Sequence, residues 1–129
     1  MKDLVFQGCG TAIATPFTKD GVNLEEFGRL LEFQIENHVD SIIVCGTTGE
    51  SSTMSTEEKE ATIKFAIDKV AKRTKVIVGT GSNNTASSVK MSKFAEDAGA
   101  DALLVVTPYY NKTTSKGLIA HYTEIANSV

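Results

Sequence analysis

Four runs of apolar or β-branched residues alternate along the chain with stretches in which apolar residues recur every three or four positions. The runs cover residues 10–15, 41–45, 75–78 and 102–106. Continuous apolar runs of this length are typical of strands that are buried on both faces, as in parallel sheets. The strand starts lie about 27–34 residues apart, which is the size of one strand–helix unit with its loops. The pattern therefore predicts four βα units in a single domain, residues 1–129.

The stretches between these runs carry the signals of helix starts. Four helices are expected, and they begin near Asn23, Ser55, Asn84 and Ser115. In the first two, a glutamate follows the capping residue three positions later, which is the pattern of a capping box. Gly99 is expected to end the third helix in a left-handed conformation.

Four βα units admit two architectures, a small doubly wound sheet or half of an eight-stranded barrel. Periodicity alone favours the doubly wound sheet, because a half-barrel leaves two bare sheet edges and an uncovered interior face. In both architectures the loops that follow the strands meet at one end of the sheet. Functional residues are therefore expected in those loops.

Composition and charge narrow the class of protein. Apolar residues make up 41% and charged residues 22% of the 129 residues, as in ordinary globular domains. The net charge of −3 and the absence of a basic run argue against nucleic-acid binding. The apolar runs are too short to span a membrane. Without a secretion signal, and with Cys9 and Cys45 in strand-like segments expected to be buried thiols, a cytoplasmic protein is predicted.

The loops after the strands are rich in glycine and hydroxyl side chains, in residues 46–52, 79–84 and 107–112. Backbone N–H groups beside glycine, together with threonine hydroxyls, can bind a carboxylate or a phosphate. Tight strand–helix turns explain the same residues without a ligand. At Tyr109 and Tyr110, a phenol at the rim is equally suited to proton relay or to an interface.

Other kinds of site find little support in the sequence. No dinucleotide-binding G-x-G-x-x-G opens a helix, and neither glycine-rich loop ends as a phosphate-binding P-loop. His38 and His121 lie in helical segments without a ligand at metal-binding spacing, and are expected on partly solvated helix faces. No cofactor and no metal site are therefore expected.

Four segments together resemble the dihydrodipicolinate synthase family. They are Gly10-Thr11-Ala12-Ile13-Ala14-Thr15-Pro16-Phe17, Gly46-Thr47-Thr48-Gly49-Glu50, Gly79-Thr80-Gly81 and Thr107-Pro108-Tyr109-Tyr110-Asn111. The resemblance covers essentially all of the chain, in order and with family-like spacing. The family belongs to the pyruvate-dependent class I aldolases, which have the TIM-barrel fold. The resemblance therefore implies an α/β chain that forms the (βα)₄ amino-terminal half of a (β/α)₈ barrel.

The resemblance also implies an activity and its residues. Members condense pyruvate with aspartate semialdehyde in the diaminopimelate route to lysine, holding pyruvate as a Schiff base on a lysine. By motif, Thr47 is the relay hydroxyl, Thr47 and Thr48 hold the pyruvate carboxylate, and Tyr110 enters the active site of a neighbouring subunit. The Thr-Thr pair with Pro-Tyr-Tyr-Asn favours the synthase over related pyruvate-dependent lyases.

A regulatory expectation follows from the same resemblance. In lysine-inhibited members the effector pocket uses positions that align with Ser51, Ser52, Thr56, Lys59, Asn83, Ser87 and Tyr109. Inhibited enzymes commonly have a glutamate where Ser87 stands, and that carboxylate pairs with the ammonium group of the effector. Weak or absent inhibition by lysine is therefore predicted.

The Schiff-base lysine of the family lies in the half that this sequence does not cover. Lys75 stands at the start of a strand, the wrong end for chemistry, and Lys112 stands in a polar loop where a solvated surface charge is expected. The chain alone is therefore expected to be inactive. Its bare edges predict a homo-oligomer formed by closure of half-barrels. A non-catalytic assembly or carboxylate-binding module stays open as the alternative.

Overall fold

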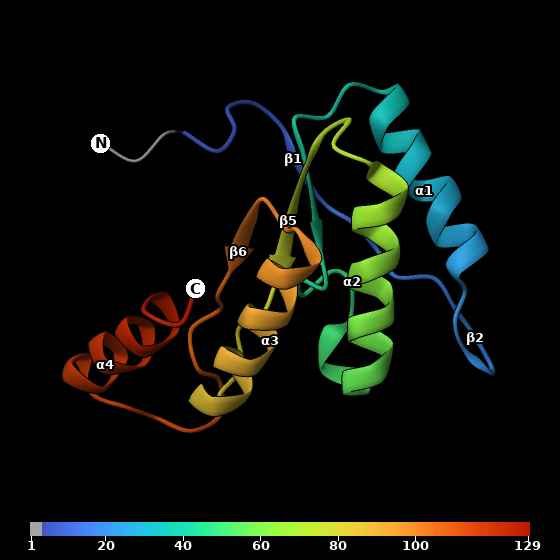
Figure 1. The fold of residues 1–129 in the computed structure, drawn as a ribbon. Coiled ribbons are helices and arrows are strands. Elements are labelled where there is room, and N and C mark those ends of the chain that lie inside the picture. The colour runs from blue at the N-terminus through green and yellow to red at the C-terminus, as the bar shows by residue number, and fades with distance from the viewer. Residues whose placement is uncertain (1–3) are drawn as a thin grey trace.

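The computed structural model describes residues 4–129 and shows a four-stranded parallel sheet with helices packed on it (Figure 1). The strands of this sheet, in spatial order, are β1 (Gly10–Ala12), β4 (Ser41–Val44), β5 (Lys75–Gly79) and β6 (Ala102–Leu104). The helices are α1 (Leu24–Glu36), α2 (Thr56–Val70), α3 (Thr85–Ala98) and α4 (Ser115–Ala126). A small antiparallel hairpin joins β2 (Phe17–Thr18) to β3 (Gly21–Val22), and a 3₁₀ turn, η1, spans Ser51–Thr53.

The strand order decides between the two architectures. Each strand of the sheet lies beside the one that precedes it, and all three pairs are parallel. Because each crossover has the same hand, successive helices lie on the same face of such a sheet. A doubly wound sheet needs a reversal of strand order, and none occurs here. The expectation from periodicity alone was therefore wrong, and the half of a TIM barrel implied by the family resemblance is confirmed.

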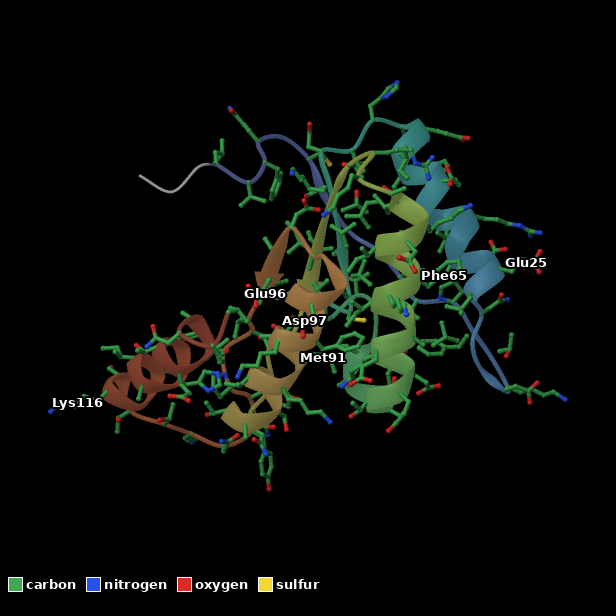
Figure 2. All side chains as sticks on the ribbon, in the orientation of Figure 1. Glu25, Phe65, Met91, Glu96, Asp97 and Lys116 are labelled. Atoms are coloured by element: carbon green, nitrogen blue, oxygen red, sulfur yellow. The ribbon has the colours of Figure 1, made fainter. Side chains whose placement is uncertain are left out.

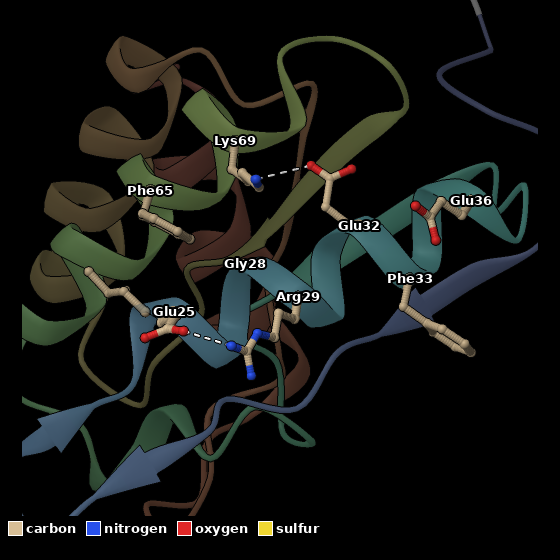
Figure 3. Close-up of a pocket in the computed structure, with 9 residues that line it drawn as sticks. Glu25, Gly28, Arg29, Glu32, Phe33, Glu36, Phe65 and Lys69 are labelled. Atoms are coloured by element: carbon tan, nitrogen blue, oxygen red, sulfur yellow. Dashed lines mark hydrogen bonds and ion pairs between the residues drawn. The ribbon is translucent and has the colours of Figure 1, made fainter.

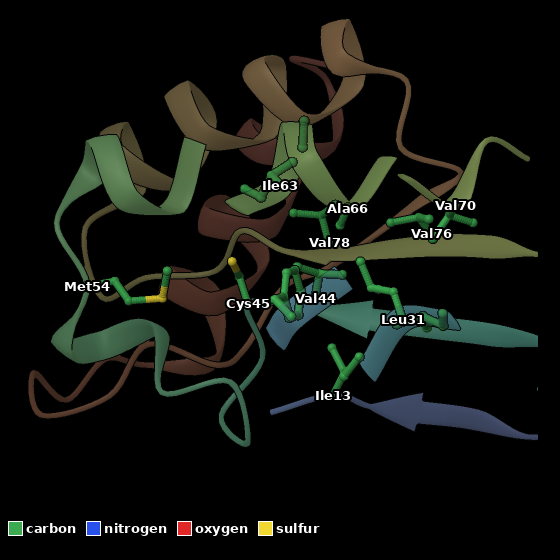
Figure 4. Close-up of a cluster of buried hydrophobic side chains, with 13 residues drawn as sticks. Ile13, Leu31, Val44, Cys45, Met54, Ile63, Ala66, Val70, Val76 and Val78 are labelled. Carbon is green, nitrogen blue, oxygen red and sulfur yellow. The ribbon is translucent and has the colours of Figure 1, made fainter. Parts of the chain in front are cut away.

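The hydrophobic core lies between the sheet and its helices (Figure 4). Val44 of β4 and Val78 of β5 are fully buried and belong to one cluster with Leu31 of α1 and Ile63 of α2. Fully burying such a side chain stabilises the fold by about 1.5–3 kcal/mol. The helix-facing side of the sheet is therefore the side that holds the fold together.

The capping signals are confirmed in different degrees. Ser55 and Glu58 form a complete capping box, since the Ser55 side chain accepts from the Glu58 N–H and the Glu58 carboxylate accepts from the Ser55 N–H. The Asn23 side chain accepts from the Glu26 N–H, but the Asn23 N–H donates to the Pro16 carbonyl instead. A backbone bond to Pro16, next to the β2–β3 hairpin, thus replaces one of the two hydrogen bonds of the predicted capping box.

The ends of the last two helices follow the same chemistry. Gly99 ends α3 with φ 97°, as predicted. Asn84 caps the start of α3 by accepting from the Ser87 N–H. The cap of α4 is Thr114, whose hydroxyl accepts from the Gly117 N–H. Across residues 4–129, no helix combines the length and apolarity that a bilayer crossing requires.

Three expectations about single polar residues were wrong. Cys9 is exposed, so its thiol is not buried. Its backbone N–H donates to the Asp40 carboxylate. His38 lies in the turn after α1 with φ 59°, outside the helix. His121 is only 7% exposed, and its Nδ1 lies 2.9 Å from the Thr85 hydroxyl of α3. The Nδ1 atom therefore has a partner on a distant segment, whereas Nε2 is buried without a hydrogen-bond partner among residues 4–129.

Candidate functional site

The loops that follow the strands meet at the carboxyl end of the sheet, at the bottom of Figure 1. The Thr15 hydroxyl donates to the Gly49 carbonyl at 2.8 Å, which joins the segment after β1 to the loop after β4. The Asn111 side-chain amide donates to the Asn83 carbonyl at 3.2 Å, which joins the loop after β6 to the loop after β5. These loops, residues 13–16, 46–50, 79–84 and 107–112, are called the rim below.

Two glycines allow the middle of the rim to close. A Cβ on Gly79 would overlap the carbonyl oxygen of Cys45, at the end of β4. A Cβ on Gly81 would overlap the backbone nitrogen of Val106, just past β6. The chain after β5 therefore passes directly against the ends of both neighbouring strands, and the four loops form one continuous surface.

The loop at 46–50 presents its two threonines to solvent. Thr47 and Thr48 are exposed, whereas Gly49 is buried and its carbonyl accepts a hydrogen bond from the Thr15 hydroxyl. The Thr47 carbonyl accepts from the Glu50 N–H, which closes the turn at 3.0 Å. Hydroxyls and N–H groups in this arrangement can bind a carboxylate without any cationic side chain.

Cys45 sets the direction of this loop and takes no part in nucleophilic chemistry. It has a φ of 56°, so the chain turns sharply as it leaves β4. Its side chain is 2% exposed, and this burial raises the pKa of the thiol to about 12. Because the thiolate is the reactive form, the thiol is inert at neutral pH.

Tyr110 projects from the rim away from its own chain. Its side chain is 97% exposed and its φ is 68°. The Asn111 N–H donates to the Tyr109 carbonyl at 2.9 Å, so Tyr110 is the centre of a tight γ-turn, a strained conformation for a bulky residue. Backbone strain that is maintained at an exposed residue points to a role outside packing.

Helix α4 positions the loop that carries Tyr110. The Tyr122 hydroxyl donates to the Thr107 hydroxyl at 3.1 Å, and the neighbouring His121 contacts α3 through Thr85. Tyr122 was not among the functional residues expected from the sequence. The signal was its hydroxyl, since a partly buried tyrosine normally finds a hydrogen-bond partner.

The positions aligned with an effector pocket lie at the same end of the sheet. Ser51 opens η1, Asn83 lies in the loop after β5 and Tyr109 lies in the loop after β6. Tyr109 is half exposed. Ser87 lies in the first turn of α3, and its N–H is bound by the Asn84 cap.

The two lysines considered as nucleophiles lie in different places. Lys75 is at the start of β5, where its ammonium group lies 3.1 Å from the Asp101 carboxylate, at the end of the sheet opposite the rim. Burial opposes ionisation of Asp101, but the Val76 N–H and Lys75 outweigh it, and the pKa of Asp101 is lowered. Lys112 is exposed in the loop after β6. Neither lysine lies in an enclosed site.

A hollow of about 520 Å³ lies along the outer faces of α1 and α2, away from the rim (Figure 3). Its charged groups pair with one another, Arg29 with Glu25 and Lys69 with Glu32. Glu32 also accepts two hydrogen bonds from Arg73, and these partners lower its pKa to about 2.

Other charged side chains also lie outside an enclosed site. Figure 2 shows that Lys116 of α4 extends away from the rest of the molecule. Throughout residues 4–129, no three His, Cys, Asp or Glu side chains are grouped so that they could hold a metal ion.

Comparison with known proteins agrees with this geometry. The model of the dihydrodipicolinate synthetase family matches residues 5–129. The chain belongs to this family. It is 62% identical over 125 residues to the 4-hydroxy-tetrahydrodipicolinate synthase of Thermoanaerobacter sp. (strain X514), covering 97% of the chain and 42% of that protein. The corresponding enzyme of Acetivibrio thermocellus is 58% identical over all 129 residues, which are 44% of its length.

A solved relative shows how closely the half-barrel follows the family fold. The crystal structure of dihydrodipicolinate synthase from Aquifex aeolicus superposes with a TM-score of 0.94 at 48% identity. The match covers 96% of this chain and 42% of that one. The chain thus spans less than half the length of the relatives it matches and has the fold of the corresponding part of that relative.

Proposed function

We propose that this chain supplies the carboxylate-binding half of a 4-hydroxy-tetrahydrodipicolinate synthase, a lyase that condenses pyruvate with aspartate semialdehyde in lysine biosynthesis. The observation that carries the proposal is the rim itself. The exposed Thr47–Thr48 pair, anchored by Thr15, and the exposed phenol of Tyr110 belong to one surface. Family membership supplies the reaction class.

The geometry supports a division of roles along the rim. The hydroxyls and N–H groups of Thr47 and Thr48 bind the pyruvate carboxylate. The amine nucleophile belongs to the part of the relatives' length that this sequence does not cover. It attacks the keto carbon, water leaves, and the resulting imine withdraws electrons so that the methyl group can lose a proton. Thr47 and Tyr110 move protons in these steps, Tyr110 from a neighbouring copy because its side chain points away from its own chain.

Reconstitution tests this function. The chain is co-purified with the carboxy-terminal part of the Thermoanaerobacter relative, and pyruvate-dependent condensation and borohydride trapping of pyruvate are measured. We expect activity from the mixture and none from the chain alone. Thr47→Val and Tyr110→Phe are each expected to lower kcat about 100-fold or more, the usual worth of a proton-transfer group. Thr123→Val, on the exposed face of α4, is the matched control.

A second candidate is a non-catalytic module that binds small keto acids. It is favoured by the fact that the carboxylate-binding loop is complete within this chain, whereas neither Lys75 nor Lys112 lies in an enclosed site. Pyruvate would then shift the amide signals of residues 46–50 in the chain alone, and the reconstituted mixture would stay inactive. Condensation activity in the mixture would exclude this candidate.

Regulation by lysine is proposed to be weak. Ser87 cannot pair with an ammonium group as a carboxylate would, so the effector loses a charged partner. The reconstituted enzyme is expected to keep its activity in millimolar lysine, and Ser87→Glu to increase its sensitivity. An inhibition constant in the low millimolar range or tighter without the substitution would contradict this.

The cellular setting is part of the same proposal. A biosynthetic enzyme of this kind is proposed to act in the cytoplasm as a homo-oligomer, because Tyr110 needs a neighbouring active site to enter. The exposed, unpaired Cys9 agrees with a reducing compartment. Fractionation of the source cells would test the location.

A further inference from the structure

The backbone turn at Tyr110 is maintained by the residues beside it. Its side chain is 97% exposed within residues 4–129, and its φ is 68°. A non-glycine residue keeps such a conformation only where surrounding contacts maintain it. The contacts that maintain the turn therefore also set the direction in which the phenol points.

The loop is stiff on the side that precedes Tyr110. The Thr107 hydroxyl accepts a hydrogen bond from the Tyr122 hydroxyl of α4 at 3.1 Å. The ring of Pro108 fixes its φ, and the residue that precedes a proline is restricted as well. The backbone is thus constrained up to Pro108.

On the side that follows Tyr110, one residue makes two contacts that hold the turn. The Asn111 N–H closes the γ-turn on the Tyr109 carbonyl at 2.9 Å, and the Asn111 side-chain amide donates to the Asn83 carbonyl at 3.2 Å. Within residues 4–129, Asn111 is the one residue of segment 108–113 whose side chain forms a hydrogen bond. A neutral hydrogen bond stabilises by about as much as one left-handed residue costs. The bond to Asn83 is therefore strong enough to maintain the turn.

The acceptor of this bond is itself held in place by α3. The N–H of Ser82, on one side of Asn83, donates to the fully buried Ser88 hydroxyl at 2.8 Å. The side chain of Asn84, on the other side, accepts from the Ser87 N–H. Because both neighbours of Asn83 are bonded to α3, its carbonyl offers a fixed point to the loop that carries Tyr110.

The two helices that hold this loop are also bonded to each other. The loop that joins β6 to α4 passes the start of α3 (Figure 1). His121 lies beside Tyr122 on α4, and its Nδ1 lies 2.9 Å from the hydroxyl of Thr85, the first residue of α3. One end of the loop is thus held by α4 at Thr107, the other by α3 through Asn83, and His121 connects the two helices.

We propose that Asn111 is a positioning residue, whose side-chain amide, bound to the Asn83 carbonyl, holds the turn that directs the Tyr110 phenol. The inference rests on the proposed function, in which that phenol moves a proton. Asn111 needs no contact with the substrate, because it acts through Tyr110. Proton transfer requires hydrogen-bond distance, and a displacement of about 1 Å can lower a rate about 100-fold.

Two variants remove the amide donor in different ways. Asn111→Asp keeps the shape of the side chain but places a carboxylate against the Asn83 carbonyl, and Asn111→Ala removes the donor without adding a charge. In the reconstituted enzyme each is expected to lower kcat at least tenfold. The KM for pyruvate is expected to stay within twofold, because Thr47 and Thr48 bind the carboxylate from another loop. Lys112→Ala, exposed and next in the sequence, is the matched control and is expected to keep full activity.

A double-mutant cycle separates positioning from a general structural role. If Asn111 acts through Tyr110, Asn111→Asp causes no further loss of kcat once Tyr110→Phe has removed the phenol. An equal loss in both backgrounds overturns the inference. An unchanged kcat, or a loss that lies in KM alone, overturns it as well.

Hydrogen exchange tests the turn without any measurement of activity. In the 129-residue chain, the amide of residue 111 is expected to exchange at least tenfold faster in Asn111→Ala, after correction for the intrinsic rate, and Lys112→Ala is expected to leave it unchanged. Unchanged protection in both Asn111 variants overturns the inference. A mixture without condensation activity, or a Tyr110→Phe variant with full kcat, counts against the proposed function instead. Exchange at residue 111 then decides by itself whether Asn111 holds the turn.

Discussion

The two ends of the sheet are built from different interactions. At the amino-terminal end, Asp101 pairs with Lys72 and Lys75 and also accepts from the Val76 N–H. At the rim, no ion pair found within residues 4–129 involves the loops; hydroxyl and amide side chains bond to carbonyls instead. A carboxylate substrate would compete with rim ion pairs, so a rim without them is free to bind it.

The two ends of the sheet also differ in where non-glycine residues adopt a positive φ. At the amino-terminal end, the non-glycine residues with positive φ follow helices: His38 after α1, and Ala71 and Lys72 after α2. Such conformations are the ordinary way to end a helix. At the rim, Cys45, Glu50 and Tyr110 have positive φ without a helix to end. A left-handed conformation costs a non-glycine residue roughly 1–2 kcal/mol at either end, but only at the rim is it adopted without ending a helix.

The sharpest way to break the rim is to fill the space beside Gly79. A Cβ there would overlap the Cys45 carbonyl oxygen, and neither backbone can move without separating β4 from β5. Gly79→Ala is expected to lower the free energy of unfolding by about 3 kcal/mol. Gly46→Ala is the matched control, because its Cβ would lie an ordinary 3.7 Å from Ile43. Urea denaturation of both variants measures the difference, and equal losses would contradict the argument.

A smaller effect is expected where Thr15 holds the carboxylate loop. Thr15 is 4% exposed, and Thr15→Val leaves the Gly49 carbonyl without its donor. The expected loss is about 1–2 kcal/mol, together with faster hydrogen exchange at the amides of residues 47–50. Thr15→Ser keeps the donor and is expected to restore slow exchange in the loop. If Thr15→Val leaves exchange in the loop unchanged, Thr15 does not position it.

The order of elements was predictable because it depends on local patterns. Apolar runs and capping residues such as Ser55 and Gly99 act within a few positions of one another, and the structure confirms them. The doubly wound interpretation failed because strand order depends on contacts between segments about 30 residues apart. Only the resemblance of the loop motifs to a known family carried that information.

The site was predictable as a set of loops but not as a geometry. The sequence shows hydroxyls at 46–50 and tyrosines at 109–110, yet nothing local indicates the γ-turn at Tyr110 or the left-handed Cys45. The burial of His121 was missed for a related reason, since its partner Thr85 lies 36 positions away. Contacts of this range have no signature in a single sequence.

The strain at Tyr110 can be measured by removing its cause. Glycine adopts positive φ without penalty, and the Tyr110 side chain is 97% exposed, so little packing is lost. Tyr110→Gly is expected to raise the free energy of unfolding by up to about 1 kcal/mol while abolishing activity in the reconstituted enzyme. Lys112→Gly in the same loop is the control for added flexibility. A destabilised Tyr110→Gly variant would mean that the tyrosine is held by packing after all.

The smallest effect, a change with pH, is expected at the opposite end of the molecule. Arg73 and Lys69 lower the pKa of Glu32 from 4.5 to about 2. The folded state therefore binds fewer protons here than the unfolded state, so this stabilisation is present above about pH 4.5 and is lost as the pH falls towards 2. Glu32→Gln cannot titrate, and its urea midpoint is expected to fall less steeply than that of the unmodified chain between pH 4.5 and 2.5. Because the pair is exposed to solvent, 1 M salt should shrink the difference. If the urea midpoints of Glu32→Gln and of the unmodified chain fall equally steeply with pH at low salt, Glu32 contributes nothing to the stability of the amino-terminal end. The contrast between the two ends would then rest on Asp101 alone.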